Sequence, residues 1–380
     1  MRWRWSIAGV LAVALFLCVS YAPVRAGEIS HSAYKVLAPL TSGNLTIFPV
    51  VSSTSYNTSM FLTLDEGLRS GEVVITETGG KRGAQPLIRR GGTLQNPSPQ
   101  EPQNARVNTL MLVNNSKRPL LLLAGEIVTG GKQDRVIGKD RIVPPQSEPI
   151  DLGVFCVEPG RWVARSDKFG GFGNLAQPSV RINAMANQNQ EMVWDSVRQS
   201  QAKVAQNVPS AAPAIHGTSS YAGAIGGAEV KREMDKIAAP LEQDYRGLIR
   251  DLRDKHAVGV VVAINGEILW ADIFASTDLL DRYWQKLVRS YAAEALSRGQ
   301  GNGKVTEAQA QSFVDHLQGR HETTDTDPGV YRQAEITGDD YTVFELTSLL
   351  PKTDFEVHIA KMFQEPTVGR MYRGPFLPQR

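Results

Sequence analysis

The chain has 380 residues, of which 42% are hydrophobic and 21% are charged, and it contains two cysteines. This composition excludes a long disordered protein, a disulfide-rich scaffold and, with 34 glycines, a collagen. The formal net charge of +2 gives no case for a dedicated nucleic-acid binder, and we expect no nucleic-acid partner. The length predicts about two to three domains, with one large domain as the alternative.

The first 26 residues have the layout of a secretory signal. Arg2 and Arg4 precede an apolar run at Ile7–Val19, and the short side chains of Val24 and Ala26 suit a cleavage site. We expect cleavage after Ala26, export to the periplasm or the outside of the cell, and no membrane attachment afterwards. An uncleaved anchor is the alternative, but the run is shorter than the ~20 residues of a spanning helix.

Cleavage would change the charge and the cysteine count of the mature chain. It would remove Arg2, Arg4 and Arg25, which lowers the formal net charge from +2 to −1. It would also remove Cys18 and leave Cys156 as the one remaining cysteine. An exported protein with one cysteine cannot close an internal disulfide. Cys156 is then either buried and inert, reactive, or paired between chains.

The first half of the mature chain is predicted to be rich in β-strands. A short helix is expected among them at Leu64–Ser70, and the Gly- and Pro-rich segment 79–106 is expected to be a flexible loop. The basic residues of that loop leave an anion-binding arm as an alternative. The predicted strands are Leu45–Val51, Val73–Glu77, Val107–Val113, Leu120–Leu123 and Ile150–Val157.

The second half is predicted to be more helical. The Ala-, Gly- and Ser-rich segment 207–228 is expected to be a flexible linker. Asn265-Gly266 predicts a tight hairpin turn between strands at Val258–Ile264 and Glu267–Phe274. A final strand pair is expected at Tyr341–Thr347 and Phe355–Ile359. The predicted helices are Gln190–Asn207, Glu229–Ala238, a separate helix opening at Pro240, Asp278–Ser297, and a short helix after Thr306.

These elements predict an α+β fold. We expect a β-rich N-terminal half with a mixed or antiparallel sheet, and helices mainly from the C-terminal half packed on it. The expected organisation is an α+β domain over residues 27–300 and a C-terminal extension over residues 301–380 with a short helix and a strand pair.

The densest polar cluster follows the buried run that ends at Leu123. Polar residues at the end of a buried strand are a common place for a site. The cluster is not a phosphate-binding P-loop, because Gly131 stands where Lys is required, and Lys132 is followed by Gln133 instead of the Ser or Thr that holds Mg²⁺. Its candidates are Glu126 and Asp134 for acid–base chemistry, and Gly130, Gly131, Lys132, Gln133 and Arg135 for binding an anion.

A second cluster, Cys156–Trp162, also ends a predicted strand, so both clusters are expected at one edge of one sheet. Glu158 is a third candidate for catalysis and Arg161 a further ligand-binding residue. Alternatively, these two residues form an ion pair that fixes a turn. Cys156 is a candidate reactive thiol only if a nearby cation lowers its pKa. The six histidines are scattered, so no metal site is predicted, and the sequence leaves the cofactor unknown.

Three motifs together resemble the ARG and rhodanese-phosphatase-superfamily-associated domain, a mostly bacterial domain of unknown function. They are Leu64–Glu72, Gly125-Glu126 with Gly130–Arg135, and Cys156–Trp162, and the resemblance covers roughly residues 33 to 300. The family name reflects association with ADP-ribosylglycohydrolases, rhodaneses and phosphatases. The resemblance therefore implies a link to ADP-ribose-like or phosphorylated metabolites, and it carries over no catalytic residue.

Three functional hypotheses follow from the sequence. In the first, the clusters form one cleft that binds a small anion or phosphorylated metabolite and hydrolyses it. In the second, the same face belongs to a non-catalytic envelope protein that binds a small anion or another protein. In the third, the glycines and charges are structural. Convergence of the cluster residues on an open cleft would favour the first two, and buried pairing would favour the third.

Overall fold

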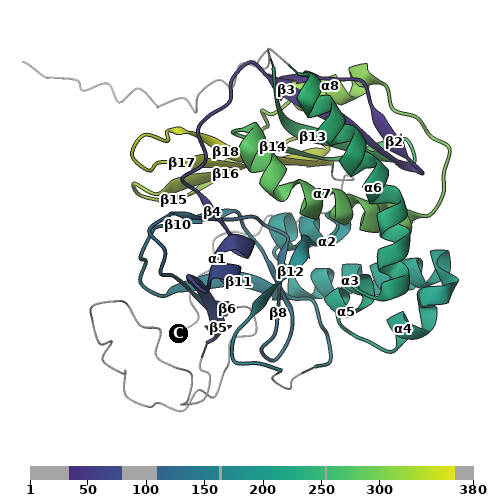
Figure 1. Ribbon diagram of the computed structural model, residues 1–380, viewed down its shortest axis with the longest axis horizontal. Coiled ribbons are helices and arrows are strands. Elements are labelled where there is room, and N and C mark those ends of the chain that lie inside the picture. Colours follow the sequence, from purple (N-terminus) through teal and green to yellow (C-terminus); the bar gives the residue numbers. More distant parts are fainter. Residues whose placement is uncertain (1–33, 79–108, 162–164, 253–254, 364–380) are drawn as a thin grey trace, which may run out of the picture. The chain divides into compact units, whose positions relative to one another are not determined.

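The computed structural model describes residues 34–78, 109–161, 165–252 and 255–363 (Figure 1). The predicted signal segment, most of the predicted loop at 79–106, and Trp162 lie outside these residues. The fold is a mixed α+β fold, as predicted, with strands in the N-terminal part, helices concentrated in residues 178–315 and further strands at the C-terminal end. No helix among the described residues has both the length and the apolar character that crossing a membrane requires.

The largest sheet has nine strands and is antiparallel throughout. The order of eight of these strands is β1-β3-β13-β14-β18-β17-β16-β15 (Figure 1). The ninth strand, β2, also pairs with β3. The strands are β1 (Tyr34–Val36), β2 (Leu40–Ser42), β3 (Leu45–Ser52), β13 (His256–Ile264), β14 (Glu267–Phe274), β15 (His321–Asp327), β16 (Tyr331–Thr337), β17 (Tyr341–Ser348) and β18 (Phe355–Phe363).

The β13–β14 hairpin lies at the centre of this sheet and confirms the predicted turn. Asn265 and Gly266 have φ angles of 55° and 84°, the left-handed values that a type I′ turn requires. On its outer sides β13 pairs with β3 and β14 pairs with β18. The predicted final strands correspond to β17 and β18, and the β14–β18 pairing joins the segment after residue 300 to the strands before it.

Of two smaller sheets, the six-stranded one carries both predicted clusters, and the three-stranded one contains β7, the strand before the first cluster. The six-stranded sheet is antiparallel and has the order β12-β8-β9-β11-β6-β5, and the three-stranded sheet has the order β10-β7-β4 with a parallel β4–β7 pair. Their strands are β4 (Leu62–Thr63), β5 (Val73–Glu77), β6 (Thr109–Asn114), β7 (Leu120–Leu122), β8 (Glu126–Thr129), β9 (Arg135–Ile137), β10 (Arg141–Val143), β11 (Ile150–Cys156) and β12 (Gly170–Leu175).

Local sequence sets the ends of several helices. Thr63 and Glu66 form a capping box at the start of α1 (Leu64–Ser70), and Gly71, with φ 73°, ends it. Ser276 caps α7 (Thr277–Arg298) by accepting a hydrogen bond from the backbone of Leu279. The other helices are α2 (Pro178–Ile182), the π-helix η2 (Asn183–Asn187), α3 (Gln190–Asn207), the 3₁₀-helix η3 (Pro209–Ala211), α4 (Ala212–His216), α5 (Tyr221–Ile225), α6 (Ala228–Asp251) and α8 (Glu307–Asp315).

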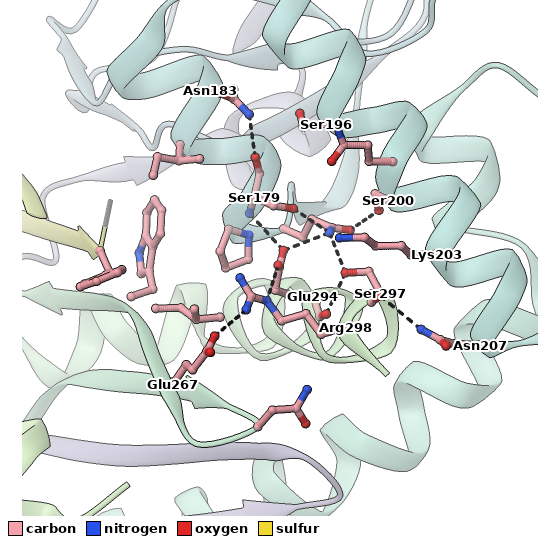
Figure 2. Close-up of a pocket in the computed structure, with 18 of the residues that line it drawn as sticks. Ser179, Asn183, Ser196, Ser200, Lys203, Asn207, Glu267, Glu294, Ser297 and Arg298 are labelled. Atoms are coloured by element: carbon pink, nitrogen blue, oxygen red, sulfur yellow. Dashed lines mark hydrogen bonds and ion pairs between the residues drawn. The ribbon is translucent and has the colours of Figure 1, made fainter. Parts of the chain in front are cut away.

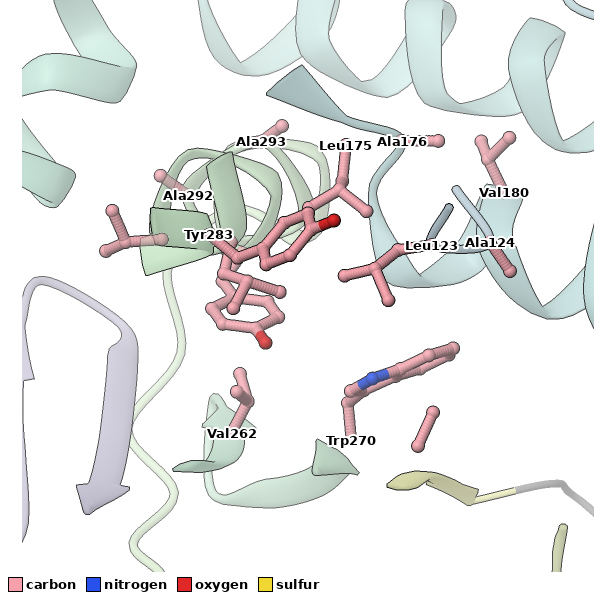
Figure 3. Close-up of a cluster of buried hydrophobic side chains, with 14 of the residues drawn as sticks. Leu123, Ala124, Leu175, Ala176, Val180, Val262, Trp270, Tyr283, Ala292 and Ala293 are labelled. Atoms are coloured by element: carbon pink, nitrogen blue, oxygen red, sulfur yellow. The ribbon is translucent and has the colours of Figure 1, made fainter. Parts of the chain in front are cut away.

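The main hydrophobic core forms around α7. This helix packs against α3, α6, β12 and β13. Figure 3 shows the buried cluster that contains Tyr283 and Ala292 of α7, Leu175 of β12, Val262 of β13 and Trp270 of β14. All five side chains are buried, so α7 joins the nine-stranded sheet to the six-stranded one through apolar contacts.

Two predictions about the helical half differ from the structure. The segment 207–228, predicted as a flexible linker, contains η3, α4 and α5. Its small residues permit close packing rather than flexibility, since Ile215 and Tyr221 are buried and Ser220 caps α5. Pro240 lies inside α6 instead of opening a separate helix. The buried residues Ala238 and Leu241 flank it, and their packing outweighs the backbone hydrogen bond that proline removes.

Candidate functional site

The turn between β8 and β9 carries the first predicted cluster. Gly130 and Gly131 have φ angles of 134° and 47°. A Cβ atom on Gly131 would lie 2.4 Å from the Phe169 ring and 2.5 Å from Oε1 of Glu77. The same Glu77 oxygen accepts a hydrogen bond of 2.8 Å from the Lys132 backbone. The glycines are therefore required by close packing within the protein.

The structure brings the second cluster against the first, because β9 pairs with β11 in the six-stranded sheet. Nη2 of Arg161 lies 2.6 Å from Oε2 of Glu158 and 3.4 Å from Oδ1 of Asp134. The same Glu158 oxygen accepts a hydrogen bond from the Asp134 backbone. Ser220 donates to Oδ2 of Asp134 at 2.7 Å, and Gln133 donates to the Glu158 carbonyl at 3.0 Å. We call Gln133, Asp134, Glu158, Arg161 and Ser220 the turn cluster.

The turn cluster is a buried ion-pair network. The side chains of Asp134 and Glu158 are each 2% exposed, and that of Arg161 is 12% exposed. Burial opposes ionisation of Glu158, but the hydrogen bonds from Arg161 and the Asp134 backbone outweigh it and hold the pKa of Glu158 below its usual range. Burial raises the pKa of Asp134, and the Ser220 hydrogen bond offsets part of that rise.

Glu126 begins β8 at the opposite end from the β8–β9 turn and has different partners. Its Oε1 atom lies 2.6 Å from Nζ of Lys286, which also lies 2.7 Å from Asp65. Burial raises the pKa of Glu126, as does the nearby Asp65, because two carboxylates share one ammonium. The predicted catalytic residues thus fall into two groups: Asp134 with Glu158, and Glu126 with Lys286.

Arg135 and Cys156 face each other as partners between β9 and β11. Both are buried, and Nη1 of Arg135 donates to the Asp134 carbonyl at 3.4 Å. Sγ of Cys156 accepts a hydrogen bond from the Glu158 backbone, and burial raises the pKa of the thiol. A reactive cysteine needs an accessible thiol with a lowered pKa, so this environment favours an inert one.

A cleft of about 770 Å³ lies elsewhere, between α2, α3, α7 and the β13–β14 hairpin (Figure 2). None of the predicted site residues lines it. We call it the Gln177 cleft. Its wall is mostly hydroxyl, amide and charged groups, with apolar surface from Ile182, Leu269, Trp270 and Phe363. The polar residues are Gln177, Ser179, Asn183, Ser196, Gln199, Ser200, Lys203, Gln206, Asn207, Asn265, Glu267, Glu294, Ser297 and Arg298.

A hydrogen-bond network centred on Gln177 fixes one side of this cleft. The Gln177 amide nitrogen donates to Oε2 of Glu294 at 3.0 Å and to Ser297 at 3.2 Å, and its oxygen accepts from Ser200 at 2.7 Å (Figure 2). Oε2 of Glu294 also accepts from the Ser179 backbone at 3.0 Å. Since Gln177 and Glu294 are buried, these groups hold their geometry without a ligand.

The charges in the Gln177 cleft are unevenly paired. Arg298 lies 3.0 Å from Glu294 and 3.1 Å from Glu267, so one guanidinium serves two carboxylates. Lys203 is exposed, and within the part of the chain that the structure describes it forms no ion pair. In Figure 2 its side chain extends toward the Gln177 network.

The model of one protein family, the ARG and Rhodanese-Phosphatase-superfamily-associated Protein domain, matches residues 33–361. The chain belongs to this family. The match covers most of the chain, and it extends past residue 300, where the resemblance was expected to end, through α8 and β15–β18. No curated protein matches the chain, and no solved structure does. The family is confirmed, and its description names no substrate.

This member of the family also has a charged network inside its main core that the sequence analysis missed. Arg181 forms two hydrogen bonds with Asp272, at 3.0 and 3.1 Å. His358 lies 3.1 Å from Asp272 through Nε2 and 2.6 Å from Asp140 through Nδ1. Burial opposes protonation of His358, but the Asp140 carboxylate outweighs it and raises the pKa of His358 to about 9. The sequence did contain a signal for this network, because Asp272 and His358 are single charged residues inside apolar strands.

The cleft residues had no comparable signal in this family member's sequence. Gln177, Lys203, Glu294 and Arg298 come from three separate segments, and none belongs to the three motifs that carry the resemblance. Among the described residues, no group of three or more His, Cys, Asp or Glu side chains is arranged to hold a metal ion.

Proposed function

We propose that this protein binds a small, hydroxyl-rich ligand with one anionic group in the Gln177 cleft. The observation that carries the proposal is a preorganised polar wall beside an open cavity of about 770 Å³. Small-molecule sites are typically clefts of roughly 300–1,000 Å³ with polar groups held in place before the ligand arrives.

The polar groups of the cleft support a ligand with many hydroxyls. Ser, Asn and Gln side chains can both donate and accept hydrogen bonds, which suits a sugar or a polyol. Phe363, which is 40% exposed and lines the cleft, offers an aromatic face that a ligand would cover.

The exposed ammonium of Lys203 is the evidence that the proposed ligand carries an anionic group. Arg298 is already shared by Glu267 and Glu294, whereas the Lys203 ammonium forms no ion pair with a described residue. A lysine held this way acts as a point charge for a phosphate or carboxylate. The proposed ligand class is therefore a phosphorylated or otherwise anionic sugar-like metabolite, in agreement with the association implied by the family name.

The geometry gives less support to hydrolysis by Glu126, Asp134 or Glu158. Each of these carboxylates already has buried partners, and none of the three lines the Gln177 cleft. A general base must reach a proton on the substrate. This favours a binding protein whose motif residues stabilise the fold, which is the alternative function that the sequence left open.

Export of the protein remains part of the proposal. It is supported by the basic start, the apolar run and the short side chains before residue 27. Expression of the full chain in a bacterium with an envelope, followed by fractionation and N-terminal sequencing, tests it. A periplasmic product beginning at Gly27 is expected, and an uncleaved cytoplasmic chain would contradict export.

The ligand class can be tested by thermal unfolding of the chain without residues 1–26. The probes are hexoses, the corresponding hexose phosphates, ADP-ribose and inorganic phosphate. A phosphorylated probe at about 100 times its Kd should stabilise the protein by about 2.7 kcal/mol and raise its Tm. Lys203→Met should abolish most of this shift, because it removes the ammonium and keeps the apolar stem.

Lys231→Met is the matched control, since Lys231 is an exposed lysine on α6 outside the cleft. It should leave the ligand-induced shift unchanged. Equal shifts in wild type and Lys203→Met would contradict the role of Lys203. A neutral hexose that shifts both equally would keep the cleft as the site and change the ligand class. Failure of every probe would overturn the proposal.

A further inference from the structure

The strand β15 forms one edge of the nine-stranded sheet and pairs only with β16 among the described strands. Its seven residues, His-Glu-Thr-Thr-Asp-Thr-Asp, run from His321 to Asp327. The first six are exposed and the last is partly exposed. The outer side of the strand therefore offers backbone N–H and C=O groups that no other described strand uses.

Three of the usual devices that protect an edge strand, a proline, a lysine and a bulge, are absent from β15. The strand contains no proline and no lysine, and its register with β16 runs through all seven residues without a bulge. Proteins normally block such an edge with a proline, a lysine or a bulge, because a long regular edge is a template for another strand. The three acidic residues, Glu322, Asp325 and Asp327, are the only charged groups that could deter pairing by repulsion.

We infer that β15 pairs antiparallel with β15 of a second copy of this chain, with Thr324 on the two-fold axis. In this register Thr324 faces its own counterpart, and the pairs that flank it are Thr323 with Asp325, Glu322 with Thr326, and His321 with Asp327. Every acidic residue is opposite an uncharged residue or a histidine. Directly opposite like charges destabilise a sheet, and this register has none.

The neighbouring registers are less favourable. The two-fold axis must pass through a residue, because residues directly opposite each other in an antiparallel pair point to the same face, and an axis between two residues would oppose side chains of different faces. Moving the axis onto Asp325 places that residue opposite itself. A twofold axis at Thr323 avoids acid pairs but uses only residues 321–325. The axis at Thr324 alone uses the whole strand and opposes no two acids.

The remaining diagonal repulsion in this register is reduced by Lys139. The two copies of Asp325 would be diagonal neighbours on one face of the joined sheet. Nζ of Lys139 lies 3.6 Å from Oδ2 of Asp325, which offsets the charge of that carboxylate. The pairing would join two nine-stranded sheets into one continuous sheet. Because one strand is a small interface, we expect a weak dimer.

Sedimentation velocity of the chain without residues 1–26, over a roughly hundredfold concentration range, tests the inference. Wild type should show a monomer–dimer equilibrium. Thr324→Lys places two lysines opposite each other and should raise the dimer Kd by roughly fivefold or more. Thr326→Lys, two residues away on the same face, places lysine opposite Glu322 and should leave the Kd unchanged or lower it.

The two variants carry the same chemical change at exposed positions, so a general effect of added charge would move both alike. Thermal unfolding of each variant verifies that the monomer fold is kept. A monomeric wild type at every concentration overturns the inference. A dimer that Thr324→Lys does not weaken, or that Thr326→Lys weakens equally, overturns the Thr324 register. The interface is separate from the Gln177 cleft, so neither result depends on ligand binding.

Discussion

The turn cluster and the Gln177 cleft both gather charged side chains, but they use them in opposite ways. In the turn cluster, Asp134 and Glu158 are 2% exposed and share Arg161. In the cleft, one guanidinium serves Glu267 and Glu294 beside an open cavity, and Lys203 is exposed. Charges that are buried and satisfied by each other stabilise one arrangement of the chain, whereas charges held at an open wall are available to a ligand.

The largest expected effect is in the turn cluster. Glu158→Gln leaves Arg161 without its closest carboxylate in a mostly buried site, so we expect the free energy of unfolding to fall by about 3 kcal/mol. Urea denaturation measures this loss, and ligand binding per folded molecule should not change. Asp195→Asn is the control, because the Asp195–Arg198 pair is exposed and should contribute less than about 0.5 kcal/mol. A stable Glu158→Gln variant that no longer binds ligand would assign ligand binding to the turn cluster and contradict its structural role.

A smaller loss of stability, with a larger loss of binding, is expected in the cleft. Glu294→Gln keeps the size of the side chain but weakens the bonds to the Ser179 backbone and Arg298. Stability should fall by about 2 kcal/mol and ligand affinity by roughly tenfold, because the network that orients the wall is disturbed. Urea denaturation and calorimetric titration measure the two quantities. Unchanged ligand affinity would show that the Gln177 network does not contribute to ligand binding.

The core network around His358 extends the comparison to pH. The pKa of His358 is about 9 in the folded protein and 6.5 when unperturbed, so its protonation stabilises the fold fully below pH 6.5 and this contribution is lost as pH rises toward 9. Between about pH 7 and 8 the free energy of unfolding should fall by about 1 kcal/mol. Glu345, with a raised pKa of about 7, and Lys361, with a lowered pKa of about 8, also titrate in this window. The first lowers stability as pH rises and the second raises it by a similar amount, so the net change is that of His358. A rise in the free energy of unfolding between about pH 7 and 8 would contradict the raised pKa of His358.

The smallest effect is expected at Cys156. The thiol is buried and its pKa is raised by burial, so a thiol reagent should modify it only when the protein unfolds. Labelling followed by mass spectrometry, with and without urea, measures this. Rapid labelling of the folded protein would instead indicate a reactive thiol and make Cys156 a candidate site residue again.

The sequence predicted local elements well where one physical signal was sufficient. The Asn265-Gly266 turn, the periodicity of α7 and the short helix at Leu64–Ser70 are each contained in a few adjacent residues. The two motif clusters do lie together, but not because the strands before them share a sheet edge. The predicted strand at Leu120–Leu123 corresponds to β7 of the three-stranded sheet, and the clusters meet because β9 pairs with β11. The sequence prediction failed over residues 207–228, where small side chains that are typical of linkers instead permit tight helical packing.

The sequence could not reveal the cleft, for a different reason. Gln177, Lys203 and Glu294 are common polar residues on separate elements, and only the packing of α2 and α3 beside α7 brings them together. Nor could it separate Glu126 from Asp134, which are eight positions apart. They lie at opposite ends of one β8–turn segment and contact different partners, Lys286 and Arg161.

The order of strands in the large sheet has a consequence for how the chain folds. The central hairpin β13–β14 is flanked by β3, from residues 45–52, and by β18, from residues 355–363. During synthesis more than half of the chain is made between β3 and its partner β13. The strand β14 lacks its partner β18 until almost the whole chain has been made. Pairings so distant in sequence slow folding. Under the proposed export, this delay would help the chain to stay unfolded while it crosses the membrane. It also makes truncation before β18 a route to aggregation through the exposed edge of β14.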